Sequence, residues 1–412
     1  MSLIRGLSAS FLVAIRSVLR QRRRTATAAS AIAFGAAALI LAGAFIEWIL
    51  WATRETTIQS GLGHIQIARA GYHDGGTADL ERFRLPAQSP ALDILRADSR
   101  VRAVAPRLSF AALVSKDETT LSFLGEGVDP AAEDKFGEIK VIIEGESLSA
   151  EAPTEIIVGY GLAENLGARV GDTLVLLTNI PGGGVNAVEA RIRGLFATIS
   201  KAYDDSVIRV PLSLANELIR ASGAHRWVVV LTDTEATRPT VEDLSLRLGG
   251  QGLELKPWYE LADFYNKTHD LLSRQMGVMF GIIGVIIVLA ISNSMMMSVM
   301  ERTAEIGTAM ALGTRRSGVL AQFLFEGFLL GLVGAGAGAL VGTALASLIS
   351  LIGIPMPPPP GQAREFTAEM LVTWPLVAEA VALAVITASL AAVYPAWRAS
   401  RIAIVDALRS GR

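Results

Sequence analysis

The chain has 412 residues, of which 51% are hydrophobic and 18% are charged, and its mean hydropathy is +0.44. This composition is typical of a membrane protein long enough for more than one domain. The polar segment 53–270 carries 22 Lys and Arg against 31 Asp and Glu, and this acidic balance argues against binding to nucleic-acid phosphates. The sequence contains no cysteine, which excludes disulfides, thiolate metal sites and a cysteine nucleophile.

The first apolar run follows a basic N-terminal segment. Residues 1–24 contain six arginines and no acidic residue, and residues 25–46 are uncharged. At 1.5 Å per residue, this run crosses a hydrocarbon core of about 30 Å. A cleavable signal peptide is the alternative, but its apolar region has about 7–15 residues with a small-residue cleavage site close behind. This run is longer and leads into bulky Trp48 and Trp51, so we predict an uncleaved first span.

The polar segment that follows is predicted to be a folded domain rather than a linker. Short β-type runs alternate in it with helical stretches and turn residues. Strands are predicted over residues 63–68, 155–158, 173–177, 188–194 and 226–231, and helices over residues 90–97, 160–166, 212–221 and 240–248. Three glycines, residues 182–184, are predicted to form a flexible hairpin tip; a plain β-turn without a contact role is the alternative.

Three further apolar runs lie in the C-terminal third, and arginines mark the loops between them. Arg302, Arg315 and Arg316 lie between spans two and three, and four more arginines follow span four. By the positive-inside rule, both termini and the loop 301–318 are predicted to be cytoplasmic, and segment 53–270 to be extracytoplasmic.

The predicted fold is therefore a membrane protein with four transmembrane α-helices and a large mixed α+β extracytoplasmic domain between spans one and two. The predicted segments, in chain order, are a basic cytoplasmic N-terminus (1–24), span one (25–52), the extracytoplasmic domain (53–270), span two (271–300), a cytoplasmic loop (301–318), span three (319–352), a short extracytoplasmic loop (353–370), span four (371–394) and a cytoplasmic tail (395–412).

Motifs for catalysis are missing from the sequence. No G-x-x-x-x-G-K-[ST] phosphate loop, H-E-x-x-H or G-x-S-x-G occurs, and all six lysines lie between Lys116 and Lys267, in the predicted extracytoplasmic domain. The four histidines are scattered. We therefore predict a chain that is not an enzyme, with no catalytic residue, no metal site and no cofactor of its own.

Residues 301–316, between spans two and three, form a candidate amphipathic helix. Ile306, Met310 and Leu312 are apolar, whereas Glu301 and Glu305 are charged. Such a helix can dock into a groove on a partner protein, or it can rest on the lipid headgroups. The residues alone leave both interpretations open.

Five stretches of the sequence follow one recognisable pattern. The loop reads ER-x-x-EIG-x-x-x-ALG, and F-L-x-EG-x-x-LG-x-x-G follows it in span three. The other three are the tail beginning YPAWRASR and residues 155–176 and 193–219 in the extracytoplasmic segment. Together they resemble the FtsX-like permease family, of the MacB and lipoprotein-releasing type, although Ile404 stands where the closing pattern of that family has proline. The resemblance covers nearly the whole chain.

The resemblance implies that this chain is the membrane subunit of an ABC transporter. Two such permeases would pair, as two copies or as two paralogues, above a dimer of cytoplasmic ATPases that bind ATP and Mg. The loop 301–318 would hold the coupling helix, and its candidate ATPase-contact residues are Glu301, Arg302, Glu305, Gly307, Leu312 and Gly313. Gly307 is expected to lie against the partner backbone; for both glycines, close packing or a helix end is the alternative.

Span three also carries small residues at helical spacing. Gly327 and Gly331 form one G-x-x-x-G pattern, and Gly334, Gly338 and Gly342 form another, so each is predicted to let a neighbouring span approach closely. Two intramembrane carboxylates, Glu326 and Glu379, are candidates for a proton relay or, more simply, for capping and interhelical hydrogen bonds.

Two functions follow from the resemblance. The first is ATP-driven mechanical transmission that releases lipoproteins or exports another hydrophobic substrate. The second is an FtsX-like regulator that activates an extracytoplasmic enzyme by transmembrane signalling. A receptor-like sensor without an ATPase is a third reading. Expected partners are the ATPase dimer, the second permease, the lipid bilayer and a periplasmic lipoprotein or adaptor, without nucleic acid. The expected location is the bacterial inner (cytoplasmic) membrane.

Overall fold

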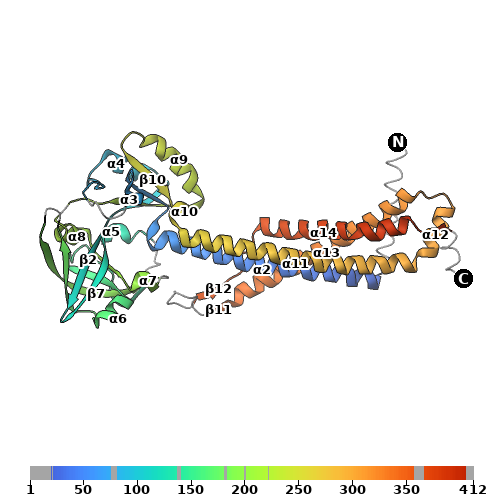
Figure 1. Cartoon of the computed structure of the whole chain (residues 1–412), viewed down its shortest axis with the longest axis horizontal. Helices are drawn as coiled ribbons and strands as arrows, with labels where there is room; N and C mark the ends of the chain where they lie inside the picture. Colours follow the sequence, from blue (N-terminus) through green and yellow to red (C-terminus); the bar gives the residue numbers. More distant parts are fainter. Residues whose placement is uncertain are drawn as a thin grey trace. The chain divides into compact units, whose positions relative to one another are not determined.

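The computed structural model describes residues 20, 22–75, 81–136, 141–180, 183–198, 201–220, 222–356 and 366–404. The chain divides into two compact units (Figure 1). The helical unit comprises residues 1–51, 268–355 and 367–412, and the α+β domain comprises residues 52–267 with 356–366. The tail motif after residue 404, including the end of the predicted segment 395–412, lies outside the described residues, as does nearly all of residues 1–24.

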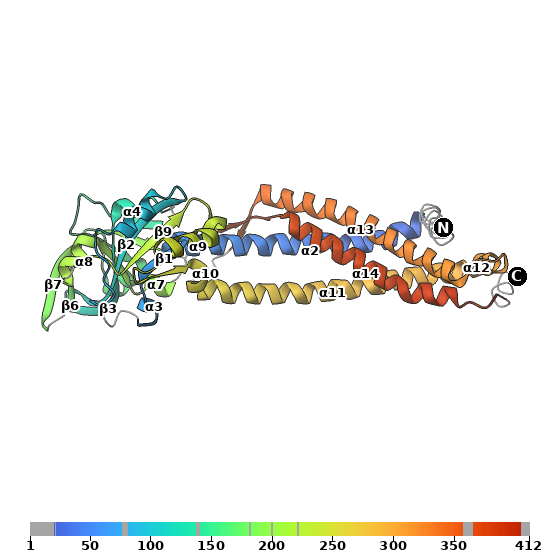
Figure 2. The ribbon, with the colours of Figure 1, turned by 90° about the horizontal axis from the view of Figure 1, so that it is seen from above.

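Four long helices dominate the helical unit. They are α2 (Arg22–Thr57), α11 (Asp263–Glu301), α13 (Arg316–Ile352) and α14 (Trp374–Ser400). Within the described part of the chain, these four are the helices long and apolar enough to cross a membrane. Figure 2 shows them running alongside one another, and the short α12 (Thr303–Ala311) connects α11 to α13 at one end.

All four helices extend past the predicted span at one end or both, and α11 and α14 extend furthest. Helix α11 begins at Asp263, eight residues before the predicted start of span two, because the polar stretch ahead of the apolar run is also helical. Helix α14 continues through Pro395 to Ser400. Its N-terminus is capped by Thr373, whose Oγ1 accepts a hydrogen bond from the Leu376 N–H at 3.4 Å.

The centre of the helical unit is built from small side chains. Ala384, Ala388, Ala392, Ala396 and Ala399 on α14 are fully buried, and they recur every three or four residues on one face of the helix. Side chains of this size let helix backbones approach closely, and close packing replaces the hydrophobic driving force that lipid cannot supply.

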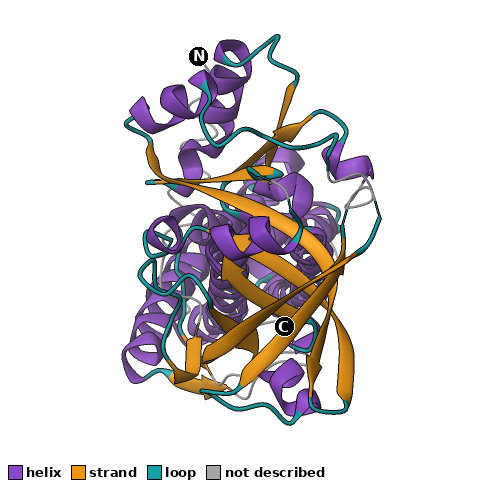
Figure 3. Cartoon of the chain, turned by 90° about the vertical axis from the view of Figure 1, so that its left-hand side faces the viewer, coloured by secondary structure: helices purple, strands orange, loops and turns teal. Residues whose placement is uncertain are grey.

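The α+β domain is organised by one mixed sheet (Figure 3). Its strand order is β10-β1-β9-β2-β3-β8-β5-β7-β4, with β6 pairing β2 and β7. The strands are β1 (Ile65–Arg69), β2 (Val101–Lys116), β3 (Thr119–Val128), β4 (Val141–Gly145), β5 (Glu155–Gly159), β6 (Thr173–Asn179), β7 (Val185–Ala197), β8 (Val207–Pro211), β9 (Arg226–Leu231) and β10 (Leu253–Pro257). A separate short pair joins β11 (Ile354–Met356) and β12 (Phe366–Ala368).

Short helices cover this sheet and connect its strands. They are α3 (Tyr72–Gly75), α4 (Pro90–Ala97), α5 (Pro130–Glu133), α6 (Tyr160–Leu166), α7 (Lys201–Asp204), α8 (Leu212–Leu218), α9 (Thr237–Arg247) and α10 (Trp258–Leu261), with a π-helical turn at Ile58–Leu62. All five predicted strand segments fall on observed strands, and all four predicted helices are confirmed within a few residues.

The domain has two main hydrophobic cores, and the 16-residue strand β2 links them. Its first half pairs with β9 beside the core of α4 and α9, and its second half pairs with β3 and β6 beside the core of α6 and α8. Strands β6 and β7 form an antiparallel hairpin, whose tip includes Gly183 and Gly184 at φ of +95° and +115°. The first glycine of the predicted triplet lies outside the described residues.

Candidate functional site at helix α12 and the elements that hold it

Helix α12 has one face buried in the helical unit and one face exposed. Ile306 and Met310, four residues apart, are 7% and 8% exposed and belong to the same core as Val319 and Phe323. The opposite face is open, and it ends in Leu312, whose side chain is 85% exposed. This end of α12 is therefore accessible to a partner, with Leu312 beside the exposed charges of Glu301 and Glu305.

Arg302 separates α12 from α11 and ties it to α13. Its backbone leaves the helical region, at φ −103° and ψ 14°, so the chain turns there. Its guanidinium Nη1 lies 3.6 Å from Oε2 of Glu326, and its Nε lies 3.3 Å from Oε2 of Glu305. It also stacks over the Phe323 ring, 5.9 Å from the centroid. Glu326 is therefore the buried counter-ion of the loop arginine.

Gly313 ends α12 with a left-handed turn. Its φ of +99° is a conformation that residues with a Cβ adopt only under strain. The Gly313 N–H bonds to the Met310 carbonyl at 3.1 Å, and the Thr314 N–H bonds to the Ala309 carbonyl at 3.0 Å. This pair of bonds is the Schellman arrangement, which satisfies the last helical carbonyls. Gly313 therefore shapes the loop.

The structure separates the six predicted contact residues into two groups. Glu301, the last residue of α11, is exposed, as are Glu305 and Leu312. Arg302, Gly307 and Gly313 instead hold or shape the loop, because Arg302 points to Glu326, Gly307 is buried, and Gly313 forms the turn. The predicted single helix over 301–316 is in fact the nine-residue α12 between two breaks.

For Gly307 the structure agrees with the alternative of close packing within the chain. The residue lies on the buried face of α12 between Ile306 and Met310. The helical period explains this burial, because residue 307 follows Ile306 by only 100° around the helix axis. A large side chain at 307 would therefore disturb the packing of the loop on its own unit.

The glycines of α13 serve two different neighbours. A Cβ added at Gly327 would lie 2.3 Å from Cβ of Ala392, and one at Gly331 would lie 2.8 Å from Cβ of Ala388, so these two face α14. The other three face α2. A Cβ at Gly334 would lie 2.6 Å from Cβ of Ile32, one at Gly338 would lie 2.5 Å from the Ala33 carbonyl oxygen, and one at Gly342 would lie 3.0 Å from Cα of Ala37.

Glu379 occupies a different environment from Glu326. It lies five residues after the start of α14, and its side chain is exposed on the surface of the helical unit. The two intramembrane carboxylates are therefore not brought together in this chain.

A buried charge network in the α+β domain had no signal in the sequence. Arg107 on β2 donates from Nε and Nη2 to Oε1 of Glu133, at 3.0 and 2.6 Å, and from Nη1 to the Gly61 carbonyl at 2.8 Å. Arg209 on β8 lies 3.9 Å from Oε2 of Glu133. Both arginine side chains are 1% exposed.

The network continues to Glu126 and Tyr203. The Tyr203 hydroxyl donates to Oε2 of Glu126 at 2.8 Å and accepts from Nη2 of Arg209 at 3.0 Å. Burial alone would raise the pKa of Glu126, but the charges of Arg209, Arg107 and Arg226 lower this pKa to about 2. Burial also raises the pKa of the Tyr203 hydroxyl, so it stays a donor. The carboxylate and the guanidinium groups are held charged together.

His64 forms a second polar connection in the same domain. Its Nδ1 accepts a hydrogen bond from the Leu231 N–H at 3.1 Å, so its Nε2 carries the hydrogen and donates to Oγ1 of Thr234 at 3.0 Å. The Thr234 hydroxyl then donates to Oε1 of Glu55 at 3.1 Å. Burial lowers the pKa of His64 to about 4, so the imidazole is neutral at pH 7.

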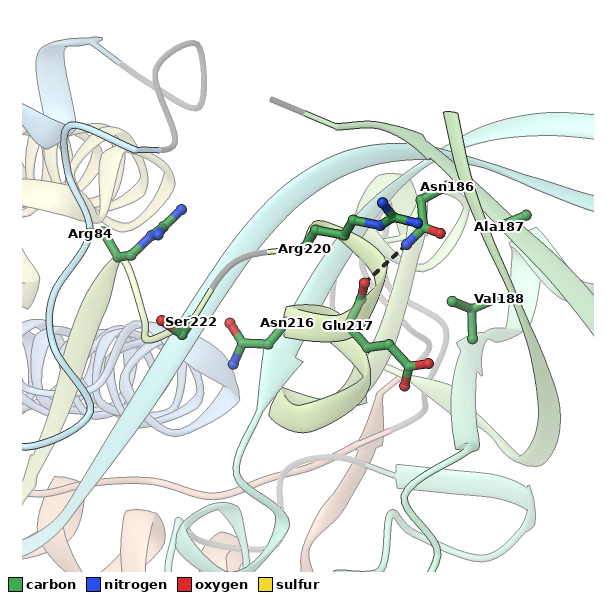
Figure 4. A pocket seen from close by; sticks show the side chains of 8 residues that line it. All are labelled: Arg84, Asn186, Ala187, Val188, Asn216, Glu217, Arg220 and Ser222. Atoms are coloured by element: carbon green, nitrogen blue, oxygen red, sulfur yellow. Dashed lines mark hydrogen bonds between the residues drawn. The ribbon is translucent and has the colours of Figure 1, made fainter. Parts of the chain in front are cut away.

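A surface hollow of about 740 Å³ lies between α8, β7 and the segment near Arg84 (Figure 4). The Asn186 amide on its rim donates to the Glu217 carbonyl at 3.0 Å. Its lining is open and polar, with Arg84, Arg220 and Ser222 among its residues. In the described part of the chain, no group of three or more His, Asp or Glu side chains is placed to hold a metal ion.

Four apolar spans, an inserted α+β domain and a tethered amphipathic loop helix define a multi-pass membrane protein of the transporter permease class. The chain belongs to the FtsX-like permease family with a MacB-like periplasmic core domain. The model of the MacB-like periplasmic core domain matches residues 25–245, and that of the FtsX-like permease C-terminal region matches residues 277–404. The chain is thus an ABC transporter permease with a periplasmic domain.

Curated relatives support the same class. The lipoprotein-releasing system transmembrane protein LolC of Xylella fastidiosa is 25% identical over 335 residues, which cover 77% of this chain and 80% of LolC. The pyoverdine export ATP-binding/permease protein PvdT of Pseudomonas savastanoi pv. phaseolicola is 28% identical over 65% of this chain, but the match spans only 40% of PvdT.

One solved structure also aligns with the chain. The periplasmic region of MacB from Actinobacillus actinomycetemcomitans is 12% identical, with 50% of this chain and 94% of that region covered, at a TM-score of 0.36.

Proposed function

We propose that this permease couples ATP hydrolysis by a separate cytoplasmic ATPase dimer, which binds ATP and Mg, to movement of its periplasmic domain. In this proposal two permease chains pair in the inner membrane, both termini are cytoplasmic, and α12 receives the movement of the ATPase. The orientation is supported by the arginines of the loop 301–318 and by the near absence of arginine from the loop 353–370.

The single observation that carries this proposal is the two-sided structure of α12. Its inner face is fixed by Ile306, Met310 and the Arg302–Glu326 ion pair, so a force applied to α12 reaches the spans. Its outer face presents Glu305, with a side chain 55% exposed, and Leu312, which is 85% exposed. A rigid helix with an exposed apolar tip and a neighbouring charge is suited to docking into a protein groove.

We further propose that the cargo is a lipid-anchored protein or another hydrophobic molecule. The match to LolC extends over 80% of that protein, whereas the match to PvdT extends over 40% of a longer ATP-binding/permease protein. Most exposed side chains of the spans are large and apolar, and they favour contact with lipid chains over an aqueous channel. The alternative function is regulation of a periplasmic enzyme without transport. A complex that hydrolyses ATP but moves no cargo would support this alternative.

The decisive experiment replaces Leu312 with Asp and measures retention of the cognate ATPase in a pull-down from solubilised membranes. We expect binding at least about tenfold weaker, because docking would bury the added carboxylate without a partner, and such burial costs at least about 2 kcal/mol. Leu246→Asp is the matched control, since Leu246 on α9 is also 85% exposed but lies in the periplasmic domain.

Equal ATPase binding by the Leu312→Asp and Leu246→Asp variants would contradict the role of α12. The orientation is tested separately with reporter fusions at Gly183 and Thr314. A cytoplasmic signal at Gly183, or a periplasmic signal at Thr314, would contradict the proposed topology.

A further inference from the structure

The surface hollow beside α8 has an unpaired strand edge as one of its walls. Over residues 185–191, one side of β7 pairs with β6, and β5 pairs with its other side only from Arg191 onward. Between residues 185 and 190, that other side therefore has no strand partner in the described part of the chain. Asn186, Ala187 and Val188 of this stretch line the hollow.

Main-chain hydrogen bonds at the end of this stretch show which residues face the unpaired side. The Ile192 N–H donates to the Asp172 carbonyl beside β6 at 2.8 Å, whereas the Arg191 N–H donates to the Thr154 carbonyl beside β5 at 3.1 Å. Successive residues of a strand direct their main-chain groups to opposite sides, so residues 187 and 189 direct theirs away from β6. An edge of this kind can receive an extended peptide as an added strand.

Two buried polar atoms in the wall of the hollow have no hydrogen-bond partner among the described residues. They are Nε of Arg84 and Oδ1 of Asn216 (Figure 4). The first atom donates and the second accepts. Because buried polar groups are almost always hydrogen-bonded, a ligand that accepts from Arg84 and donates to Asn216 would complete both. A peptide with acidic side chains has both kinds of group.

Arg220 brings a second cation to the hollow from an unfavourable backbone position. It follows Ile219, the C-cap of α8, and its φ is +49°. Glycine is the usual residue at this left-handed position, because a Cβ is strained there. An arginine therefore stands where glycine would be more stable, and strain of this kind clusters at binding sites. Its exposed side chain lines the hollow.

The charge of the hollow is opposite to that of the surrounding domain. Arg84 and Arg220 line it against one carboxylate, that of Glu217. The segment 53–270 is nevertheless acidic overall. The ion pair of Arg84 with Glu81 is long, at 3.7 Å, and lies on the surface. An anionic ligand is therefore attracted to this hollow and repelled by most of the rest of the domain.

We propose that the hollow binds an extended acidic segment of a periplasmic protein, which adds to β7 as a further strand. Its main chain pairs with residues 187 and 189, and one of its N–H groups donates to Oδ1 of Asn216. Its carboxylates accept hydrogen bonds from Arg84 and Arg220, and such charge-assisted bonds are stronger than neutral ones. The inference goes beyond the proposed coupling function and uses neither α12 nor the ATPase.

Fluorescence anisotropy with the purified full chain in detergent tests the site. The probe is a labelled ten-residue peptide in which threonine and glutamate alternate. We expect saturable binding that weakens as salt is added. The same peptide with glutamine in place of glutamate is the control, and it should bind at least about tenfold more weakly because its hydrogen bonds are no longer charge-assisted.

Arg220→Gly separates binding from folding. Glycine removes the guanidinium and relieves the strain, so Tm should stay the same or rise while peptide binding becomes about 3- to 10-fold weaker. Arg84→Gln should weaken binding to a similar degree. Arg238→Gln is the matched control, because Arg238 is an exposed arginine on α9 outside the hollow, and it should bind the peptide like the unmodified chain.

Ala187→Pro tests the added strand. Proline lacks the N–H that faces the unpaired edge, and residue 187 does not donate to β6, so peptide binding should be lost while the fold is kept. Ala187→Ser keeps the N–H and should bind the peptide normally. Circular dichroism of both variants verifies that the domain is folded.

Four results would overturn the proposal. They are equal binding of the glutamate and glutamine peptides, no binding of either, equal binding by Arg220→Gly and Arg238→Gln, and full binding by folded Ala187→Pro. Displacement of the peptide by free glutamate at equal concentration would show a site for small anions instead of an extended segment. Since the coupling role is tested by Leu312→Asp and ATPase retention, either proposal can fail while the other stands.

Discussion

The packing of α13 on α2 gives a prediction whose size follows from the structure. In Gly338→Ala, the new Cβ would lie 2.5 Å from the Ala33 carbonyl oxygen and 2.7 Å from Cβ of Ala36. Optimal contacts between carbon atoms are about 3.5–4.0 Å, so the two helices must separate by about 1 Å. Such a gap removes a quarter to a half of the dispersion energy of each contact along the interface.

We therefore expect Gly338→Ala to destabilise the helical unit by about 2 kcal/mol, within the range of 1–3 kcal/mol typical of overpacked sites. For a unit of this size, that corresponds to a fall of about 4–8 °C in Tm. The measurement is the fraction of the full chain that remains monodisperse in detergent after heating. Gly336→Ala is the matched control, because a Cβ at Gly336 on the exposed side of α13 meets nothing within 4 Å.

A compensating change makes the test sharper. The methyl group of Ala36 is the side-chain atom nearest to a Cβ at position 338. Removing it with Ala36→Gly should therefore raise the Tm of the Gly338→Ala variant part of the way back to that of the unmodified chain. Equal Tm values for Gly338→Ala and Gly336→Ala would refute the reasoning, since they would show that α13 does not pack on α2 through this glycine.

Two predictions concern the α+β domain. The pKa of His64 is about 4 in the folded domain and near 6.5 in the unfolded chain, so between these values only the unfolded state binds the proton. The free energy of unfolding should therefore fall by about 2 kcal/mol from pH 7 to pH 5. Denaturation followed by tryptophan fluorescence measures this change, which should be smaller in the His64→Gln variant. Arg107→Met should lower the free energy of unfolding by about 3–5 kcal/mol, because the buried Glu133 carboxylate then has only the more distant Arg209 as a partner. Arg238→Met, which removes an exposed arginine, is the control. A similar loss of unfolding free energy in both variants would argue against the network.

The membrane spans could be predicted because a bilayer imposes a minimum apolar length on every crossing helix. The position of α12 could also be predicted from its motif, but the sequence could not decide between a partner contact and close packing for Gly307. The residue at which a short helix begins decides which of its side chains face the core of the helical unit. Here the break in the helical backbone at Arg302 fixes the first residue of α12. The glycine spacing of α13 indicated close approach but not which helix approaches.

Strands β2, β3, β4, β8 and β10 were not among the predicted elements, and for β2 the composition explains why. Pro106 and Arg107 interrupt the apolar alternation of β2, although Arg107 is buried by its pairing with Glu133. The charge network joins residues that are far apart in sequence, such as Glu126 and Arg209, 83 positions apart. A buried arginine and an exposed one look alike in a sequence, so only the fold could bring these residues together.

The contacts of α13 suggest how a movement of α12 would spread. Glu326 holds the loop through its ion pair with Arg302. The next residue, Gly327, has no side chain, so α13 packs closely against Ala392 of α14 and near Met295 of α11. The anchor of the loop and the point where three helices meet are therefore neighbours in the chain. Packed helices move as bodies rather than deform continuously. A displacement of α12 would thus shift α13 against α14 first, and α2 would follow through the glycines two turns further along.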